Sequence, residues 1–366
     1  MKVAFVSFDF GEYCIRLASS MAPDSNILLF LPKQEAEPHM HLLSKSVRLR
    51  SFDKPRLRQP FRQIQMVIQL VRQIRDFRPD VIHLQAGHLW FNWALPMFGD
   101  CPLVLTVHDP SKHFGDAESG KTPDWVRNLA SYRAHERIVH APQMKRLLLQ
   151  RLRIPSSTVH VIPHIQIGAD TAGEYVREED HLILFFGRIW QYKGLEYLIR
   201  AEPLITSRVP GARIVIAGRG QDFGYYRRLM VHPDRFVVHN EYVSDEKRSE
   251  LFRRASVVVL PYVEASQSGV IPMAYSFGKP VVATAVGGLP AQVEDGKTGY
   301  LVPPRDEVAL AEAIVRLLSN GDLRRALGAN GKQKIAAEAN PDLIAQNTLA
   351  IYRLALTPGS QLRNYQ

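Results

Sequence analysis

The sequence is poor in cysteine and has no uninterrupted apolar run of bilayer length. Its 366 residues include two cysteines, Cys14 and Cys101, too few for a disulfide framework, and neither stands in a metal-binding spacing. The most apolar stretch, residues 88–107, is broken by prolines and polar residues, so it predicts a helix, a turn and a strand rather than a membrane span. Asp9 interrupts the first apolar run before a secretory signal is complete. We therefore expect a reducing, cytoplasmic location.

Acidic residues are outnumbered by basic ones, and no Asp-x-Asp pair occurs. The 46 Lys and Arg against 36 Asp and Glu give a formal net charge of +10. This excess suggests an anionic partner, namely nucleic acid, an anionic membrane or a phosphorylated substrate. The sequence has no basic and aromatic stacking platform and no recognised nucleic-acid-binding module, which argues against nucleic acid. The absence of an Asp-x-Asp pair is consistent with chemistry that needs no metal.

What the sequence does have is a regular alternation of apolar runs and amphipathic segments. Hydrophobic residues make up 46% of the chain and charged residues 22%, which is typical of a globular protein. A chain of this length usually divides into two domains. The alternation predicts α/β domains with parallel sheets, and the polar segment 168–180 suits a linker between them.

The clearest local signal lies where the apolar run 181–186 ends. This run predicts a buried strand, Gly187 a break after it, and the residues from Gly194 onward a helix. Arg188 and Lys193 are therefore expected at the carboxyl end of a parallel strand, where open α/β sheets bind ligands. Two cations beside a helix start suit a phosphate-bearing ligand. Two solvated loop cations would explain these residues about as well.

A second junction of this kind follows the apolar run 257–262. Small polar residues within 264–270 separate this predicted strand from a predicted helix at 271–277. Backbone N–H groups at such a junction, together with the positive end of the helix, favour an anion. A further predicted strand, 281–284, leads to a Gly-Gly turn. Several strand ends of the second domain are therefore expected to converge on one cleft.

Taken in order, these motifs resemble the carboxy-terminal half of retaining, nucleotide-sugar-dependent glycosyltransferases of family 4, the glycogen-synthase-like group. Joint agreement over about half of the chain is far more specific than any single motif. The matching segments are 187–188, 193–194, 216–220, 260–270, 278–281, 287–290 and 295–299. The amino-terminal half matches more loosely.

The resemblance implies a GT-B fold, in which two Rossmann-like doubly wound parallel-sheet domains face each other across an interdomain cleft. It places an acceptor-side domain at 1–165, a nucleotide-sugar-binding domain at 166–340, and a helix that crosses back to the first domain, with a tail, at 341–366. The implied reaction moves a sugar from a nucleotide-sugar donor to a glycan, a lipid-linked acceptor or another precursor, as in polysaccharide biosynthesis. It retains anomeric configuration and requires no metal or other cofactor.

The resemblance also indicates which residues would bind the donor and which would contact the transferred sugar. Arg188 and Lys193 would bind the pyrophosphate of the donor, and Glu264 and His108 would contact the transferred sugar, so these four are the catalytic candidates. The candidate donor-binding residues are Gly187, Gly218, Gly220, Tyr242, Ser266, Ser268, Gly269 and Val270.

In the first domain the candidates lie after predicted strands. Gly11 and Glu12 fall in the loop expected after the strand 3–8, where the family has a glycine-rich loop facing the acceptor, although a plain turn explains them as well. His108 follows the strand 103–107 and, apart from the resemblance, would be taken as a loop cap. No third ligand of suitable type accompanies His108 and His113, so a metal site is not expected there.

One feature departs from the family pattern. The family has a second glutamate at a fixed spacing after the first, and this residue contacts the ribose hydroxyls of the donor. The positions that this spacing reaches from Glu264, or by counting back from the next motif, hold Pro272 and Met273. The ribose contact is then lost or supplied elsewhere. A non-catalytic nucleotide-sugar-binding protein of the same fold is therefore an alternative.

Two other enzyme classes explain parts of the sequence less well. Gly218, Gly220 and Gly224 follow a predicted strand, and Glu241 stands about where a ribose-binding acid would lie in an NAD(P)-dependent oxidoreductase. However, the third glycine is one residue late for that fingerprint. Glycoside hydrolysis needs two carboxylates flanking the bond, and Glu264 has no evident partner in these motifs.

Residues 48–78 are strongly basic and contain a helical apolar pattern. The pattern predicts an amphipathic helix at 61–77 whose apolar stripe packs on the sheet. The residues of this stripe are Ile64, Val67, Ile68, Val71, Ile74 and Phe77. The arginines would face solvent or, as a sharper hypothesis, an anionic membrane, where each cation gains about 1 kcal/mol. A peripheral contact with the inner face of the membrane is the corresponding expectation for location.

Overall fold

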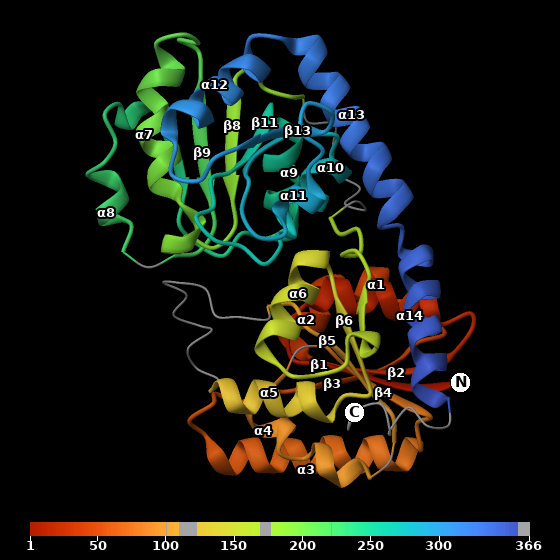
Figure 1. Cartoon of the computed structure of the whole chain (residues 1–366). Coiled ribbons are helices and arrows are strands. Elements are labelled where there is room, and N and C mark those ends of the chain that lie inside the picture. Colours follow the sequence, from red (N-terminus) through yellow and green to blue (C-terminus); the bar gives the residue numbers. More distant parts are fainter. Residues whose placement is uncertain (86, 100, 110–122, 169–176, 221, 358–366) are drawn as a thin grey trace. The chain divides into compact units, whose positions relative to one another are not determined.

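The fold is described from a computed structural model. It describes residues 1–357 except 86, 100, 110–122, 169–176 and 221, and it leaves out the side chains of Asp124 and Arg127. His113 and most of the predicted linker lie outside the described residues. The chain forms two compact units (Figure 1). The first holds the described residues up to 165 together with those from 339 onward, and the second holds the described residues of 166–338.

The first unit is built on a parallel sheet with the strand order β3-β2-β1-β4-β5-β6-β7. The strands are β1 (Lys2–Ser7), β2 (Asn26–Pro32), β3 (Arg48–Phe52), β4 (Val81–Gln85), β5 (Leu103–Thr106), β6 (Glu136–Val139) and β7 (Val159–Val161). β1 and β2 are continuous apolar runs that are buried after their first residues. This is expected of parallel strands with helices on both faces.

Helices cover both faces of this sheet (Figure 1). They are α1 (Gly11–Met21), α2 (Lys33–Ala36), α3 (Pro60–Phe77), α4 (Leu89–Asn92), α5 (Asp124–Arg133), α6 (Pro142–Arg151) and α14 (Pro341–Leu356), with the 3-10 helices η1 (Glu37–Leu42), η2 (Leu95–Phe98) and η4 (Ser156–Thr158). α14 packs against α1. Its Tyr352 hydroxyl lies 2.6 Å from Nδ1 of His83, which is buried in the middle of β4.

The second unit has its own parallel sheet, with the strand order β10-β9-β8-β11-β12-β13. The strands are β8 (Leu182–Phe186), β9 (Arg213–Ala217), β10 (Phe236–His239), β11 (Val257–Leu260), β12 (Val281–Thr284) and β13 (Gly299–Val302). The helices are α7 (Leu195–Thr206), α8 (Gly224–Arg227), α9 (Asp245–Arg254), α10 (Val270–Ser276), α11 (Leu289–Gln292), α12 (Glu307–Leu318) and α13 (Gly321–Glu338), with η5 (Gln191–Lys193) and η6 (Pro233–Arg235). The buried apolar faces of α7 and α12 form the core of one side with the strands.

Both sheets are doubly wound, as the sequence predicted. In the first, the chain runs outward from β1 through β2 to β3 and then returns to the other side of β1 with β4. In the second, it runs from β8 to β10 and returns beside β8 with β11. The strand order therefore reverses between β1 and β4 and between β8 and β11. Ligands of open α/β sheets bind outside the carboxyl ends of the strands at such points.

The start of α1 differs from the prediction. The helix begins at Gly11, so Gly11 and Glu12 lie in its first turn and not in the predicted loop. The Gly11 N–H donates a 3.0 Å hydrogen bond to the Glu35 carboxylate, and a Cβ on Gly11 would lie 1.9 Å from the Glu35 carbonyl oxygen. Close approach to α2 is thus the physical reason for glycine here.

The orientation of α3 also differs from the prediction. Met66, Leu70 and Ile74 are buried against the sheet, whereas Ile64 and Ile68, predicted to pack inward, are exposed. α3 therefore presents apolar residues to solvent as well as to the core. None of the helices in the described part of the chain is long and apolar enough to cross a membrane.

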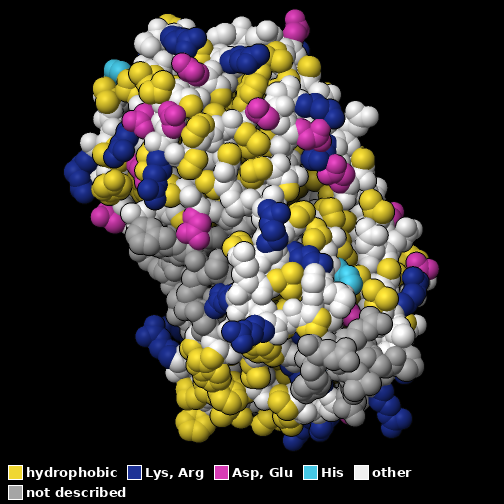
Figure 2. All heavy atoms as spheres, in the orientation of Figure 1, with side chains coloured by type: hydrophobic (Ala, Val, Ile, Leu, Met, Phe, Trp, Pro, Cys, Tyr) yellow, Lys and Arg dark blue, Asp and Glu magenta, His cyan; other side chains and the backbone are white. Residues whose placement is uncertain are grey.

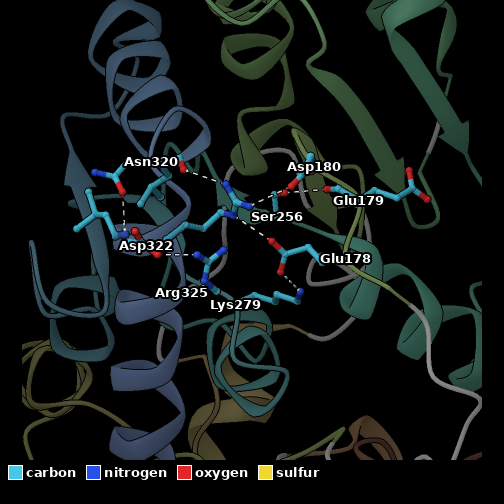
Figure 3. A network of polar contacts seen from close by, with 11 residues as sticks. Glu178, Glu179, Asp180, Ser256, Lys279, Asn320, Asp322 and Arg325 are labelled. Atoms are coloured by element: carbon cyan, nitrogen blue, oxygen red, sulfur yellow. Dashed lines mark hydrogen bonds and ion pairs between the residues drawn. The ribbon is translucent and has the colours of Figure 1, made fainter.

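Three consecutive acidic residues fix the chain as it enters β8 (Figure 3). The Glu178 carboxylate accepts from Nζ of Lys279 at 2.5 Å and from Nε of Arg324 in α13 at 3.0 Å. Asp180 also contacts Arg324, at 3.4 Å, while Glu179 accepts from Arg254 in α9 at 2.5 Å. The side chain of Arg324 is only 6% exposed. The network joins this segment to α9, α13 and the turn before β12.

We expect Arg324→Ala to lower the free energy of unfolding by about 2–4 kcal/mol, because it removes a buried guanidinium together with its contacts to Glu178 and Asp180. Urea unfolding measures this loss. Arg325→Ala is the matched control, since Arg325 pairs only with an exposed Asp322 and its side chain is 68% exposed. A surface pair contributes about 0–1 kcal/mol. Equal losses in the two variants would contradict a structural role for the network.

Candidate active site

Two cations stand at the carboxyl end of β8, as the sequence predicted. Arg188 is exposed, and the Lys193 ammonium lies over the ring of Tyr262, 3.7 Å from its centroid. Lys193 ends η5 and is followed by Gly194 in a left-handed conformation with φ 63°. A Cβ on Gly194 would lie 2.0 Å from the Pro261 carbonyl oxygen. Glycine therefore lets η5 approach the end of β11 closely.

The segment after β11 is tied to η5 by backbone hydrogen bonds. Val263 N–H donates to the Tyr192 carbonyl at 2.8 Å, and Glu264 N–H reaches the same oxygen at 3.4 Å. Glu264 is thereby placed next to the segment that carries Lys193, on the other side of the point where strand order reverses. Glu264 is half-buried.

The junction before α10 is held by a side-chain clamp. The amide of Gln292 in α11 accepts from Ser268 N–H at 3.0 Å and donates to the Ser268 carbonyl at 3.0 Å. The Ser268 hydroxyl lies 3.2 Å from Val270 N and 3.3 Å from the Tyr262 hydroxyl. Gly269 follows Ser268 at the start of α10. The positive end of α10 is therefore fixed beside β11.

The Gly-Gly turn after β12 lies against this same loop. Gly287 has φ 52°, and a Cβ there would lie 1.5 Å from the carbonyl oxygen of Ala265. Ser266, the next residue, is buried. Thr284, at the end of β12, donates from its hydroxyl to the Tyr262 carbonyl at 2.6 Å. The strand ends of β8, β11 and β12 thus converge, as the sequence predicted.

Tyr262 interacts with both cations of the site and with Ser268. Burial raises the pKa of Tyr262 to about 12, and the hydrogen bond with Ser268 and the charge of Arg188 oppose that shift. The phenol therefore stays neutral at physiological pH. It offers Lys193 a ring face and lies within the electrostatic reach of Arg188. The site combines two cations with a neutral aromatic platform.

The glycines after β9 pack against the loop after β8. Gly218 has φ 147° and a Cβ there would lie 2.0 Å from the Gly187 carbonyl oxygen. Gly220 pairs with Ile189 in a parallel bridge and donates from its N–H to Asn240 at 2.8 Å. Close packing of two strand ends accounts for these glycines. Tyr242, on the segment after β10, is 76% exposed.

The positions that lack the second family glutamate are buried. Pro272 and Met273 both lie in α10, and Met273 is 6% exposed. A Cβ on Gly168 would lie 3.1 Å from the Met273 side chain. A packed apolar residue thus occupies the position at which the family pattern has a glutamate.

In the first unit, His108 follows β5 and belongs to an aromatic cluster that the sequence did not reveal. Its ring stacks on Phe10 with centroids 4.0 Å apart, and its Nε2 lies 2.7 Å from Nε2 of Gln85 at the end of β4. Glu12 lies one turn before Arg16 in α1 and pairs with it at 3.0 Å. Gly11 and Glu12 are both buried.

Two further histidines complete the cluster at the strand ends. His140 follows β6 and His164 follows β7, and their ring centroids lie 5.3 Å apart. His108 is 4.9 Å from His140, and Tyr13 contacts His164 at 5.0 Å. Burial lowers the pKa of His140 to about 3 and that of His108 well below its usual value, with the neighbouring imidazoles adding to both shifts. These rings are neutral hydrogen-bonding groups.

No group of three or more His, Cys, Asp or Glu suited to a metal ion occurs among the described residues. The cluster of three imidazoles is therefore a packed aromatic group. Metal independence stays a prediction.

The two halves of the chain match two family models. Residues 12–165 match "Glycosyltransferase Family 4" and residues 180–320 match "Glycosyl transferases group 1". A D-inositol 3-phosphate glycosyltransferase from Kribbella flavida is 34% identical over 312 residues, which is 75% of this chain and 71% of that protein. The chain belongs to glycosyltransferase family 4.

Other relatives of this family 4 glycosyltransferase are also named as glycosyltransferases or glycogen synthases. An uncharacterised glycosyltransferase of Methanocaldococcus jannaschii is 33% identical over 183 residues, 50% of this chain and 47% of that protein, so the match spans about half of each. A glycogen synthase from Mycobacterium tuberculosis is 26% identical over 306 residues, 77% of this chain and 70% of that protein. The oxidoreductase interpretation of Gly218 and Gly220 is therefore wrong.

Solved structures show the fold. The sucrose-phosphate synthase of Thermosynechococcus elongatus aligns with a TM-score of 0.74 at 20% identity, over 97% of this chain and 98% of that one. HepE of Anabaena, solved with UDP and glucose, aligns with a TM-score of 0.72 at 18% identity, over 97% of this chain and 100% of that one. The two doubly wound domains of this family 4 glycosyltransferase therefore form a GT-B fold.

Proposed function

We propose that this glycosyltransferase moves a sugar from a nucleotide-sugar donor to a glycan or lipid-linked acceptor, with retention of anomeric configuration and without a metal ion. One observation carries the proposal. Arg188, Lys193 and the start of α10 gather at the carboxyl edge of the second sheet, beside the point where strand order reverses. This is a ready site for a diphosphate.

The proposed chemistry follows from charge. When the bond between the sugar and the diphosphate breaks, positive charge grows on the sugar and negative charge on the leaving phosphate. Groups that are fixed in advance stabilise this charge without reorganising, and such preorganisation lowers the barrier. Lys193 is fixed by the Tyr262 ring, and the loop before α10 by Gln292. These contacts do not depend on a metal.

The sugar end of the donor is assigned by family resemblance. The resemblance makes Glu264 and His108 the residues that would contact the transferred sugar. Glu264 is held by its backbone contact with Tyr192. A neutral His108 suits a hydroxyl group, since a neutral imidazole both donates and accepts. Retention would follow from attack on the face from which the phosphate departs, with the phosphate assisting and no protein nucleophile.

We assign the acceptor and the location by the same reasoning. Gly11 and Glu12 start α1 at the carboxyl edge of the first sheet, where an acceptor would bind. A lipid-linked acceptor and the basic segment 48–78 favour a cytoplasmic protein with a peripheral contact to an anionic membrane, in polysaccharide biosynthesis. One neighbour in structure, HepE of Anabaena, has been solved with UDP and with UDP-glucose, and the latter is a nucleotide sugar, the class of donor that we propose.

The proposal is tested by thermal stabilisation with UDP, GDP and ADP sugars, with NAD and NADP included. One nucleotide-sugar class is expected to raise the melting temperature by several degrees, because a ligand that binds only the folded state stabilises it. Arg188→Ala should abolish this shift. Arg208→Ala is the matched control, since Arg208 is an exposed arginine beyond the far end of α7 from the site and should leave the shift intact.

Turnover then separates the remaining alternatives. A product whose anomeric configuration is the same as that of the donor, formed in the presence of EDTA and identified by NMR, would support a retaining, metal-independent transferase. Donor binding without transfer to any acceptor would instead favour the non-catalytic alternative, for which the buried Met273 in place of a glutamate is the specific observation. A shift with NAD or NADP alone would overturn the proposal.

A further inference from the structure

α3 carries apolar residues on two opposite faces. The inward face is buried in the first unit and includes Met66, Leu70 and Ile74. The outward face carries Phe61, Ile64 and Ile68, whose exposed fractions are 86%, 46% and 44%. Successive residues of an α-helix are about 100° apart, so these three fall within about 60° of one another. Their stripe lies opposite the buried one.

The neighbouring helices extend this exposed surface. α4 packs against both α3 and α5, and Trp93 and Trp125 beside them are 59% and 55% exposed. Their rings meet edge to face with centroids 5.1 Å apart. Figure 2 shows hydrophobic side chains gathered on this side of the first unit. We call Phe61, Ile64, Ile68, Trp93 and Trp125 the outer face.

Positive charge surrounds the outer face. Between Asp53 and Asp76 the sequence has no acidic residue. The cations within that interval are Lys54, Arg56, Arg58, Arg62, Arg72 and Arg75. Arg56, Arg58 and Arg62, at the amino-terminal end of α3, are exposed. An apolar surface with this excess of cations along α3 complements a partner that is apolar inside and anionic at its boundary.

We propose that the outer face docks on an anionic lipid bilayer and inserts its aromatic and aliphatic side chains below the headgroups. Tryptophan is enriched at the membrane interface, and helices bind there with an apolar face in the lipid and Lys or Arg at its border. This proposal deepens the peripheral contact proposed above, in which the cations alone met the membrane. It predicts binding that persists when the electrostatic attraction is screened.

A second copy of the chain fits this surface less well. A symmetric dimer through the outer face would bring two sets of unbalanced arginines together, and like charges across an interface cost several kcal/mol. An anionic bilayer instead attracts them. Exposed apolar patches on single proteins mark interaction sites, and the charge border selects the lipid.

The test measures binding of the full chain to vesicles of 70% phosphatidylcholine and 30% phosphatidylglycerol by co-sedimentation at 0.1 M and 0.5 M NaCl. Phe61→Ser with Ile64→Ser should lower the partition coefficient at least tenfold at both salt concentrations. Arg58→Gln with Arg62→Gln should lower it mainly at low salt. Val231→Ser is the matched control, because Val231 is an apolar residue of the second unit that is 63% exposed and should bind as the wild type.

Insertion is tested directly by quenching of tryptophan fluorescence with lipids brominated on the acyl chain. The wild type should be quenched, and Trp93→Phe with Trp125→Phe should lose most of the quenching. Equal vesicle binding by the wild type and the Phe61 and Ile64 variant would overturn the proposal. The proposal would also be overturned if sedimentation velocity showed the wild type as a dimer and the Phe61 and Ile64 variant as a monomer. Vesicle binding needs no nucleotide sugar, so the result is independent of whether a donor binds.

Discussion

Lys193→Ala is expected to lower kcat with the true donor by about 100-fold or more. Removing one preorganised group that stabilises developing negative charge typically costs about 10²–10³ in kcat. Lys193 is held over Tyr262 at the end of β8, so the charge is already in place when the phosphate departs. Steady-state kinetics with saturating acceptor measures the effect.

The fold should survive this substitution. The Lys193 ammonium contacts two aromatic rings, those of Tyr192 and Tyr262, and a cation–π contact contributes about 0.5–2 kcal/mol. A small drop in melting temperature is therefore expected beside the large loss of turnover. Lys247→Ala is the control, since Lys247 lies in α9 and pairs there with Glu250. Unchanged turnover in Lys193→Ala would contradict the proposal that Lys193 stabilises the departing phosphate.

Acidification is expected to destabilise the first unit strongly. Burial lowers the pKa of His83, His88 and His140 to about 3, and that of His108 well below its usual value. These histidines stay neutral in the folded chain and take up protons only when it unfolds. Their contribution to stability is therefore complete above pH 6.5 and is lost as the pH falls toward their folded pKa values.

The expected size of this loss is large. Each such histidine costs about 1.4 kcal/mol between pH 7.5 and 5.5, since one pKa unit corresponds to that free energy. Four together give about 5.5 kcal/mol, which is comparable with the whole stability of a small domain. Glu35, whose pKa burial raises, offsets part of it.

Urea unfolding at pH 7.5 and 5.5, followed by tryptophan fluorescence, measures this loss. Trp90, Trp93 and Trp125 lie in the first unit and only Trp190 in the second, so the signal reports mainly on the first. His140→Gln should reduce the pH dependence by about a quarter. A loss below about 1 kcal/mol in the wild type would mean that these histidines are protonated in the folded state.

Much of the fold follows from local patterns. The family resemblance implied a returning helix with a tail at 341–366, and α14 spans Pro341–Leu356 with a proline at its first position. β8 and β11 were predicted because buried parallel strands are continuous apolar runs between turn residues. The position of Arg188 and Lys193 was predictable as well, since it depends only on where β8 ends.

Features that depend on packing were not predictable. Apolar residues occur on both faces of α3, so periodicity alone could not show that Ile64 and Ile68 face outward. Gln292 is far from Ser268 in sequence, and only the fold brings the amide to that backbone. A polar residue at the end of a predicted helix or strand is the local sequence feature that suggests a side-chain hydrogen bond of this kind.

The histidine cluster was missed for the same reason. His108, His140 and His164 follow three different strands, and each on its own is an ordinary loop residue. The parallel order of β5, β6 and β7 places the ends of these strands side by side. The strand before His140, β6, was not predicted from the sequence. Recognising it would have placed the three histidines after successive strands of one sheet.

The return of α14 to the first unit constrains synthesis on the ribosome. α14 packs on α1, and its Tyr352 hydroxyl lies against His83 in the interior of the first sheet. The described residues of the second unit, by contrast, all fall between 166 and 338, before α14 in the chain. The domain that is translated first therefore completes its core only after the second has emerged, which reverses the usual order in which nascent domains mature.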